Sequence, residues 1–349
     1  MIRVGILFGG QSAEHEISVQ SARNILAALS PTHYQPVPIG ITRQGQWWLA
    51  DPNWLIQASP QKLPPFEQGL APVGVIPSQG LIHFSQNHWE PLPVDVVFPV
   101  LHGPRGEDGT VQGLLTLAGL PFVGAGVLGS AVGMDKEVMK RLLTQAGLAV
   151  GHYRCYRRGV SVEPATVVAE LGLPVFVKPA NMGSSVGVTK VCTADDLLPA
   201  LAKAWKYDAK VLVEQAITGR EIECAILDGV PPQASVPGEI IPQHEFYSYE
   251  AKYLDDQGAV LKMPADLAPN QVAQVQRLSV QVFQVLECRG LGRVDWFFTP
   301  DGDWIVNEIN TIPGFTQISM YPKLWELSGI SYSDLVHRLL ELALTGTEG

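Results

Sequence analysis

Twice in its N-terminal half, the chain has an apolar run and, after it, apolar residues at helical spacing. The first run, residues 2–8, ends at Gly9-Gly10, and the second covers residues 94–101. The helical stripes that follow are Ala22, Ile25, Leu26 and Leu29, and then Val111, Leu114, Leu115 and Ala118. Apolar residues at this spacing form one face of a helix. Because strands that alternate with helices form parallel sheets, the N-terminal region is predicted to be a parallel α/β unit.

The charge balance excludes several classes of protein. The 349 residues hold 24 Lys+Arg against 34 Asp+Glu, a formal net charge of −10. A broad nucleic-acid-binding or anionic-membrane surface needs clustered excess Lys and Arg, so no nucleic-acid or membrane partner is expected. No apolar stretch approaches the roughly 20 residues that cross a bilayer as a helix. The N-terminus is typical of a strand and not of a signal peptide, which predicts a cytoplasmic protein.

Breaks in the pattern predict more than one domain, and the length predicts two or three. Residues 43–93 hold eight prolines and several tryptophans, which predicts an insertion with short, interrupted structure and little chemistry. A glycine-rich stretch, residues 124–130, opens a helix predicted to end near Gly147, and this helix marks the first boundary. A small α+β unit follows, with strands near residues 153–156, 174–178 and 210–214. The rest begins with a hairpin through Asp228-Gly229 and contains two helices, whose stripes are Val275, Leu278, Val282, Val285 and Leu286, and then Leu335, Leu339, Leu342 and Ala343.

Residues 292–310 are the stretch most informative about chemistry. Asp301-Gly302 lies between two β-rich runs, which is a strong signal for a two-residue hairpin loop. Such a loop sets the register of the whole hairpin, and side chains that alternate along each strand then share a face. The directly opposed pairs on one face would be Asp295 with Glu308 and Arg293 with Asn310.

The opposed carboxylates of Asp295 and Glu308 need a positive partner, because like charges directly across a sheet repel. Mg²⁺ prefers oxygen ligands and commonly binds through one or two carboxylates and the phosphates of a nucleotide. The pair therefore predicts a magnesium and nucleotide site. The alternative is a solvated face on which Arg293 neutralises Asp295, and a slip of one residue in the loop would change the register.

A glycine-rich turn at residues 181–187 follows the strand that contains Lys178. Glycines let backbone N–H groups approach an anion, and a nearby lysine supplies positive charge for phosphate. The turn lacks the Gly-Lys-Ser/Thr of a Walker sequence, and an ordinary Gly/Ser loop explains it equally well. Gly9-Gly10 likewise lacks the spacing of a dinucleotide fingerprint.

An ordered set of motifs covers nearly the whole chain, at residues 9–18, 101–109, 134–136, 177–179 with 183–187, 249–253, 292–295 and 307–316. This set resembles that of the D-alanine–D-alanine ligase family of the ATP-grasp superfamily. The resemblance implies an ATP-grasp α/β fold: an N-terminal parallel α/β (pre-ATP-grasp) domain followed by two α+β domains that clamp ATP. In this chain the three domains would be residues 1–130, 131–221 and 222–349.

The resemblance implies a cytoplasmic ligase that makes D-alanyl-D-alanine for peptidoglycan precursors from D-alanine and ATP. ATP would phosphorylate the carboxylate of the first D-alanine, and the amine of the second would attack the acyl phosphate. A tetrahedral intermediate would then expel phosphate. The family also implies a homodimer as a common assembly.

For ATP, the resemblance implies two sets of residues. The phosphates would be held by Lys136, Lys178, Ser184, Ser185 and Lys252. The adenine and ribose would be bordered by Glu214, Ala216, Ile217 and Glu221. Without the resemblance, Lys136 is explained as a solvated helix lysine and Glu221 as an exposed strand charge. Lys252 belongs to residues 249–253, a loop implied to close over the phosphates and to exclude water.

For the metal and the transition state, the resemblance implies residues of the C-terminal hairpin and the segment after it. Two Mg²⁺ ions, for which Mn²⁺ can substitute, would be bound by Asp295, Glu308 and Asn310. Arg293 and the backbone N–H of Gly314 would stabilise the oxyanion and the transferring phosphoryl oxygens. A guanidinium suits this role because it keeps its charge throughout turnover.

For the amino acids, Glu14 is implied to pair with the ammonium of the first D-alanine; otherwise it is an acidic residue that stabilises a helix N-terminus. His102 would contact the acceptor region, or else serve only as a hydrogen-bonding loop residue. Ser184 and Tyr253 resemble, with Glu14, a trio that orients the substrates. The carboxylate of the second D-alanine would be received near Ser319 and Met320.

Three alternatives stay open. Lys252-Tyr253 resembles the dipeptide-forming members, but a D-alanine–D-lactate or D-alanine–D-serine ligase is the within-class alternative. A catalytically silent ATP-binding protein and a nicotinamide-dependent dehydrogenase are the others. The group that takes the proton of the attacking amine is also open, because an unperturbed tyrosine pKa near 10 makes Tyr253 a poor base.

Overall fold

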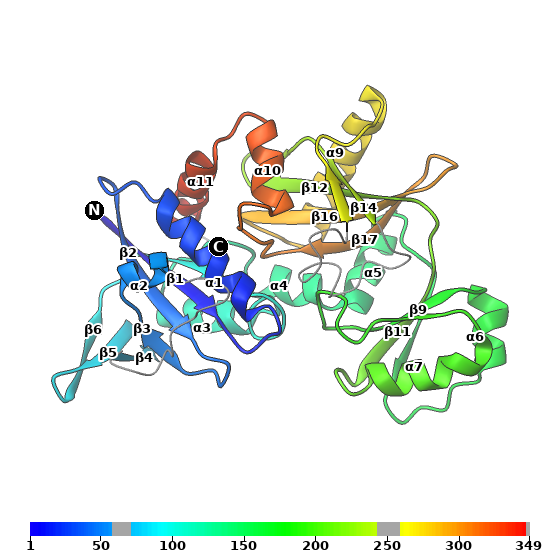
Figure 1. Cartoon of the computed structure of the whole chain (residues 1–349), viewed down its shortest axis with the longest axis horizontal. Coiled ribbons are helices and arrows are strands. Elements are labelled where there is room, and N and C mark those ends of the chain that lie inside the picture. The colour runs from blue at the N-terminus through cyan, green and yellow to red at the C-terminus, as the bar shows by residue number, and fades with distance from the viewer. Residues whose placement is uncertain (58–70, 243–258, 347–349) are drawn as a thin grey trace.

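The computed structural model of the protein describes residues 1–57, 71–242 and 259–346. Within them, three sheets of seven, four and six strands follow one another along the chain. Figure 1 places the first sheet at the left, the second at the lower right and the third between them. Among the helices of these described residues, none combines the length and the apolar character needed to span a bilayer.

The first sheet has the predicted parallel strands at one end. β1 (Ile2–Gly9) lies between β2 (Tyr34–Ile41) and β7 (Val96–Val100) and is parallel to both. α1 (His15–Ala28) and α3 (Thr110–Ala118) follow β1 and β7 as expected. Both helices bury their predicted stripes except at Leu114, which is 37% exposed.

The proline- and tryptophan-rich segment differs from the predicted insertion. Its elements are short, as expected, but they extend the first sheet with antiparallel strands, because tryptophan, valine and isoleucine suit a pleated, half-buried surface. None of its described residues lines the pocket discussed below. The elements are β3 (Trp47–Leu49), α2 (Pro52–Gln57), β4 (Ala71–Ile76), β5 (Gly80–Ser85) and β6 (His88–Leu92).

Asp135 divides in two the helix predicted to run to Gly147. α4 (Val127–Met134) ends at this residue, and α5 (Lys136–Gln145) begins after it. The Asp135 carboxylate accepts hydrogen bonds from two backbone N–H groups in the first turn of α5, as an N-cap residue does. The expectation of one continuous helix is therefore wrong, and the break sets Lys136 at a helix start.

The second sheet is antiparallel throughout, in the order β10-β9-β11-β8. Side chains of α6 and α7 pack with its strands into a separate core. Every strand predicted here is present. The elements are β8 (Tyr153–Arg157), α6 (Pro164–Leu171), β9 (Val175–Pro179), β10 (Thr189–Val191), η1 (Ala194–Asp196), α7 (Leu197–Ala204) and β11 (Lys210–Gln215).

The third sheet has the order β15-β14-β12-β16-β17, with β13 beside β12. α9 (Pro269–Val285) packs on β12 and β16 and buries Val282 and Phe283 there. Because side chains alternate, Glu223, Arg293 and Asp295 lie on the face of these strands that is turned away from α9. The strands are β12 (Arg220–Leu227), β13 (Gln233–Ala234), β14 (Gly238–Pro242), β15 (Ala259–Lys262), β16 (Leu291–Phe298) and β17 (Trp304–Asn310).

The hairpin of β16 and β17 has the predicted pairs, although the predicted loop is wrong. Near the turn, Phe298 pairs with Trp304, and the backbone N–H of Thr299 donates to the carbonyl oxygen of Asp303. The loop therefore has three residues, 300–302, and ends at Gly302 with φ of 90°. A bulge then adds Asn307 to β17 and restores the expected register. The pairs beyond the bulge are Asp295 with Glu308 and Arg293 with Asn310.

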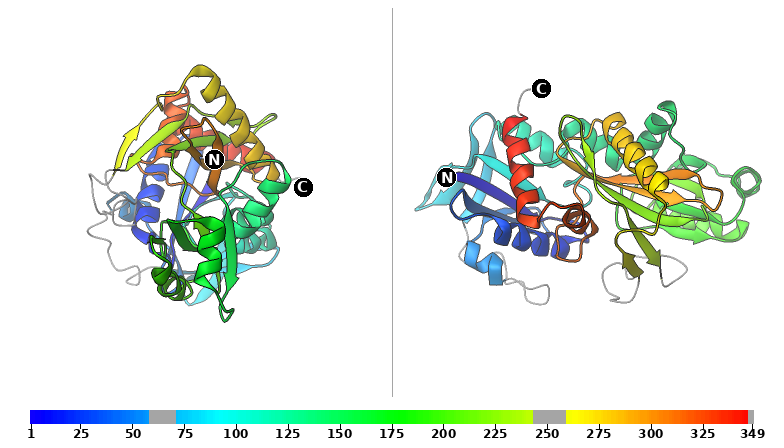
Figure 2. Two further views of the ribbon diagram at one scale, coloured as in Figure 1. Left: turned by 90° about the vertical axis from the view of Figure 1, so that its right-hand side faces the viewer. Right: turned by 90° about the horizontal axis from the view of Figure 1, so that it is seen from above.

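Several helices pack outside the sheet that their place in the sequence suggests. α5 packs against α9, so its side chains belong to the core of the third sheet. α10 (Met320–Leu327) and α11 (Tyr332–Thr345) share a core with β1, β7 and α1. Figure 2 shows α11, in red, beside the blue strands of the first sheet. The division into residues 1–130, 131–221 and 222–349 stays a prediction.

Candidate active site

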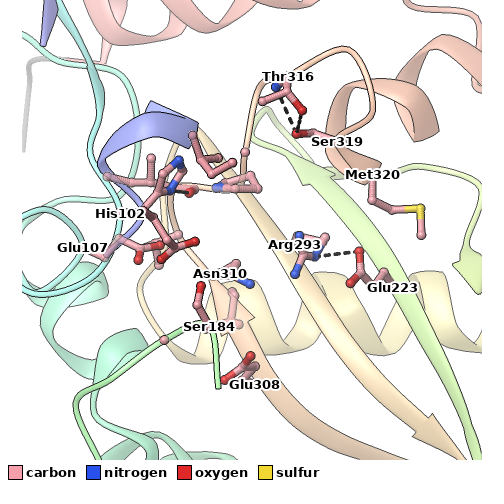
Figure 3. Close-up of a pocket in the computed structure, with 18 of the residues that line it drawn as sticks. His102, Glu107, Ser184, Glu223, Arg293, Glu308, Asn310, Thr316, Ser319 and Met320 are labelled. Atoms are coloured by element: carbon pink, nitrogen blue, oxygen red, sulfur yellow. Dashed lines mark hydrogen bonds and ion pairs between the residues drawn. The ribbon is translucent and has the colours of Figure 1, made fainter. Parts of the chain in front are cut away.

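A pocket of about 220 Å³ lies where the first and third sheets approach each other. It is lined by the start of α1, the loop after β7, the junction of α4 and α5, the β16–β17 hairpin and the segment after β17. Figure 3 shows side chains from these elements pointing toward one another. Of the predicted site residues, the pocket brings together Glu14, His102, Lys136, Ser184, Arg293, Glu308, Asn310, Gly314, Ser319 and Met320.

Two of these residues follow parallel strands of the first sheet. Glu14 immediately precedes α1, and His102 comes soon after β7. They are 9% and 6% exposed. Nδ1 of His102 lies 3.1 Å from the carbonyl oxygen of Ile312, which ties this loop to the segment after β17. Both residues lie together because parallel strands present their carboxyl ends at one edge of a sheet.

Glu107 also lines this side of the pocket, and the sequence analysis assigned it no role. It is 7% exposed, and its Oε2 accepts a hydrogen bond of 2.6 Å from the backbone N–H of Gly103. Burial and the neighbouring charge of Glu14 raise the pKa of Glu107 to about 8. Glu107 belongs to the motif at residues 101–109, and this position in the sequence could have identified it as a site residue. It lies beside His102 in the structure (Figure 3).

The third sheet supplies a row of charged groups. Nε and Nη2 of Arg293 lie 2.7 and 2.8 Å from the two oxygens of Asp295. Nε of Arg293 is also 2.9 Å from Oε2 of Glu223, a residue of β12 that the sequence analysis did not single out. Nζ of Lys136 lies 3.0 Å from Oε2 of Glu308 and donates to the carbonyl oxygen of Met182 at 2.9 Å.

The predicted metal ligands can be tested against this arrangement. Asp295 and Glu308 are directly opposed, and the amide of Asn310 lies on the same face. Among the described residues, no three His, Cys, Asp or Glu side chains gather closely enough to hold a metal, so the set depends on the amide oxygen of Asn310. Two carboxylates and an amide are hard oxygen donors, which suit Mg²⁺. The residues present therefore fit the predicted ion.

A second charged cluster lies on β11 and α5, outside the pocket. The buried carboxylate of Glu214 lies 2.6 Å from Nζ of Lys140 and also pairs with Lys178. Burial alone would raise the pKa of Glu214, but Lys140 and Lys178 outweigh it and lower that pKa. Lys140, fully buried four residues after Lys136 on the same helix, was missed although this spacing indicates a shared face.

The other predicted nucleotide residues follow β9 or β11, or lie on β12. Ser185 directly follows Ser184, and both have positive φ, of 59° and 52°. Ala216 and Ile217 follow β11, and Glu221 is on β12. The pocket does not include Lys178, Ser185, Glu214, Ala216, Ile217, Glu221 or Asp295.

The segment after β17 forms the remaining wall. Thr316 donates its backbone N–H to Oγ of Ser319 at 2.9 Å, and the two hydroxyls lie 2.8 Å apart. A Cβ added to Gly314 would lie 2.8 Å from the same Oγ, so a larger residue there would displace the hydroxyl of Ser319. Met320 begins α10 and is 5% exposed. Lys252 and Tyr253 lie outside the described residues.

Comparison with known proteins identifies the family. Two sheets that carry the charged clusters, joined to an α/β domain that closes the pocket, form an ATP-grasp fold. The family described as "D-ala D-ala ligase N-terminus" matches residues 3–125, and "D-ala D-ala ligase C-terminus" matches residues 142–341. The chain belongs to the D-alanine–D-alanine ligase family.

Relatives and solved structures agree with this assignment. D-alanine–D-alanine ligase A of Chromobacterium violaceum is 50% identical over 349 residues, covering 98% of this chain and 95% of that protein. The structure of the D-alanine–D-alanine ligase from Coxiella burnetii matches with a TM-score of 0.87 and 37% identity over 99% of this chain and 95% of that chain. The VanG D-Ala:D-Ser ligase from Enterococcus faecalis matches with a TM-score of 0.86 and 34% identity, over 98% of this chain and 99% of that one.

Proposed function

We propose that the protein joins two D-alanine molecules into D-alanyl-D-alanine at the expense of ATP, as a step of peptidoglycan precursor synthesis. The observation that carries this proposal is the pocket, which Glu14, at the start of α1, lines together with the charged hairpin of the third sheet. A carboxylate suits the ammonium of an amino acid, and a guanidinium suits its carboxylate or a phosphoryl group. The names of the relatives above describe the same activity.

The chemistry needs two steps, because a free carboxylate does not react with an amine. First, a carboxylate oxygen of the first D-alanine attacks the γ-phosphorus of ATP, which yields an acyl phosphate and ADP. The amine of the second D-alanine, after losing a proton, then attacks the carbonyl carbon. Phosphate leaves from the tetrahedral intermediate, and the peptide bond remains.

The pocket residues take roles that follow from their chemistry. Glu14 binds the ammonium of the first D-alanine, with Ser184 and Tyr253 completing a trio that orients the substrates. Arg293 and the N–H of Gly314 stabilise the oxygens that gain negative charge. The second D-alanine is received by His102, Ser319 and Met320.

The nucleotide lies between the second and third sheets in this proposal. Its adenine and ribose are bordered by Glu214, Ala216, Ile217 and Glu221, and its phosphates are held by Lys136, Lys178, Ser184, Ser185 and Lys252. Asp295, Glu308 and Asn310 would hold Mg²⁺, two ions in all, or Mn²⁺. When bound, these ions neutralise phosphate charge and polarise the transferred group.

The test is phosphate release from Mg-ATP with D-alanine, L-alanine, or D-alanine plus D-lactate, with products identified by mass. Release that depends on D-alanine and yields D-alanyl-D-alanine supports the proposal. ATP binding without release for any pair would favour a silent ATP-binding protein instead.

A second acceptor is the alternative, because the chain also matches the VanG D-Ala:D-Ser ligase closely. Adding D-serine to the same assay, in competition with D-alanine, separates the two. A mixed dipeptide as the main product would move the assignment to a D-alanine–D-serine ligase.

We also propose that the protein works in the cytoplasm, where ATP is available, and as a homodimer, with no nucleic-acid or membrane partner. Light scattering on the purified protein tests the assembly. A mass near twice 37.9 kDa supports the dimer, and a mass of 37.9 kDa contradicts it.

A further inference from the structure

The guanidinium of Arg293 lies between two carboxylates from neighbouring strands. Asp295, two residues along β16, binds it with both oxygens, at 2.7 and 2.8 Å. Glu223 approaches from β12, with Oε2 2.9 Å from Nε. Figure 3 labels Glu223 and Arg293 on adjacent strands, with a dashed line between them. Arg293 therefore has one partner on its own strand and one on the next.

The strand register explains why two carboxylates share this guanidinium. Glu223 is directly opposite Asp295, and Asp295 is directly opposite Glu308. Three carboxylates thus form one row across β12, β16 and β17. Because like charges opposed in a sheet are destabilising, the row needs cations, and Arg293 and Lys136 supply two.

The proposed function gives Asp295 a second task, since it is also assigned to the metal. Nε of Arg293 carries a single hydrogen, which one carboxylate at a time can accept. A guanidinium held by Asp295 alone would lose its orientation when those oxygens turn to a metal ion. Glu223 is only 5% exposed and is assigned to no ligand, so it can accept the Nε–H when the oxygens of Asp295 turn to the metal ion.

We propose that Glu223 is a positioning residue that keeps the guanidinium of Arg293 aimed into the pocket while Asp295 serves the nucleotide. This inference rests on the proposed function, which assigns Arg293 to the oxygens that gain charge. Glu223 acts through Arg293, so its loss slows the chemical step and leaves nucleotide binding nearly unchanged.

The test is Glu223→Gln, which keeps the shape of the side chain and removes its charge. We expect kcat for D-alanine-dependent phosphate release to fall about 10- to 100-fold, because small misplacements of a reacting group have effects of this size. The KM for ATP should change less than about twofold. If Glu223→Gln does not fold, Glu223→Asp, which keeps the charge but shortens its reach, should give a smaller loss of kcat. An unchanged kcat in a folded variant would overturn the inference.

A matched control exists in the same sheet. Glu239 of β14 is 7% exposed and binds Arg220 through two contacts of 2.7 Å, but it does not line the pocket. Glu239→Gln should lower Tm about as much as Glu223→Gln while leaving kcat unchanged. An equal loss of kcat in both variants would mean that Glu223 is merely structural.

Arg293→Lys distinguishes failure of this inference from failure of the proposed function. If Arg293→Lys leaves kcat unchanged, the proposed role of Arg293 fails; if it lowers kcat and Glu223→Gln does not, only the positioning inference fails. The double variant should be no slower than Arg293→Lys alone, and an additive loss would contradict action through Arg293.

In the ligand-free protein, the Nε–H NMR signal of Arg293 should shift in Glu223→Gln and stay in place in Glu239→Gln.

Discussion

The two charged clusters of this protein have opposite imbalances. On the second sheet and α5, one carboxylate faces two ammonium groups: Glu214 with Lys140 and Lys178. On the third sheet, three carboxylates face two cations: Glu223, Asp295 and Glu308 with Arg293 and Lys136. The first cluster has one cation in excess, a balance that suits a phosphate, and the second has one carboxylate in excess, a balance that suits a metal ion. A nucleotide with its metal carries both complementary charges.

This difference is a local property that the overall composition hides. A net charge of −10 argues only against a broad nucleic-acid-binding or anionic-membrane surface, and the cluster around Glu214 is locally positive. Charges at buried positions interact more strongly than those in water, so one unbalanced group there outweighs many on the surface. The predictions that follow remove charges from each cluster in turn.

The largest effect on activity is expected in the row of three carboxylates on the third sheet. Glu308→Gln removes a carboxylate opposed to Asp295 and the partner of Lys136, and it should lower D-alanine-dependent phosphate release by about 10³-fold or more. Far-UV circular dichroism and Tm should stay close to those of the unmodified protein. Asp303→Asn, on the exposed tip of the same hairpin, serves as the control and should be fully active. Normal turnover in Glu308→Gln would exclude the row from the reaction.

Removing a charge from the cluster around Glu214 should lower the free energy of unfolding. Lys140→Met leaves the buried carboxylate of Glu214 with a single partner, and breaking a buried pair of this kind costs about 3–5 kcal/mol. Urea unfolding measures the loss. The double variant Lys140→Met/Glu214→Gln should regain part of it, because the uncompensated charge is gone. A loss below about 1 kcal/mol would mean that water reaches Glu214.

Glu107 is expected to make the stability of the protein depend on pH. Its pKa of about 8 in the folded protein lies above the ordinary 4.5. Between these two pH values, the folded state therefore holds a proton that the unfolded state has released. Its contribution to the stability of the fold is therefore complete below pH 4.5 and is lost as pH rises through 8, up to about 5 kcal/mol. The charges that face it are Glu14, Glu308 and Lys136.

Glu107→Gln tests this dependence and can still accept the hydrogen bond from Gly103. Urea unfolding at pH 5, 7 and 9 should show the unmodified protein losing stability relative to the variant as pH rises. Parallel curves for the two proteins would contradict a protonated Glu107.

The smallest effect is expected at an exposed pair on the same helix as Lys140. Nε of Arg141 lies 2.7 Å from Oε1 of Glu137, but the arginine side chain is 62% exposed. Arg141→Ala should cost about 0.3–0.5 kcal/mol, because water screens such pairs. If Arg141→Ala lost as much unfolding free energy as Lys140→Met, burial would not explain the difference between these two positions.

The hairpin shows how far local sequence can carry a prediction. The pairing of Asp295 with Glu308 is as predicted because two errors cancel: the loop has three residues, and Asn307 is an extra residue in β17. Buried Val306 and Ile309 are three positions apart, a spacing that an unbroken strand would not place on one face. That spacing was a readable signal of the bulge.

Other features depend on contacts between distant segments, which local patterns do not contain. Glu223 meets Arg293 only because β12 neighbours β16, and β3 to β6 join the first sheet only because β3 pairs with β2. Asp135, in contrast, was readable as an N-cap, since Asp before a helical pattern commonly ends one helix and begins another. The roles of the site residues, including Lys252 and Tyr253, stay predictions.

The last helix has a consequence for how the chain is made. α11 packs on β7 and α1, and its buried residues, among them Leu335 and Leu339, complete the core of a sheet that begins at β1. During synthesis from the N-terminus, part of one apolar face of this first sheet therefore stays uncovered, beside α1, until α11 has left the ribosome. Shortening the C-terminus by one helix would damage the part of the molecule that was synthesised first.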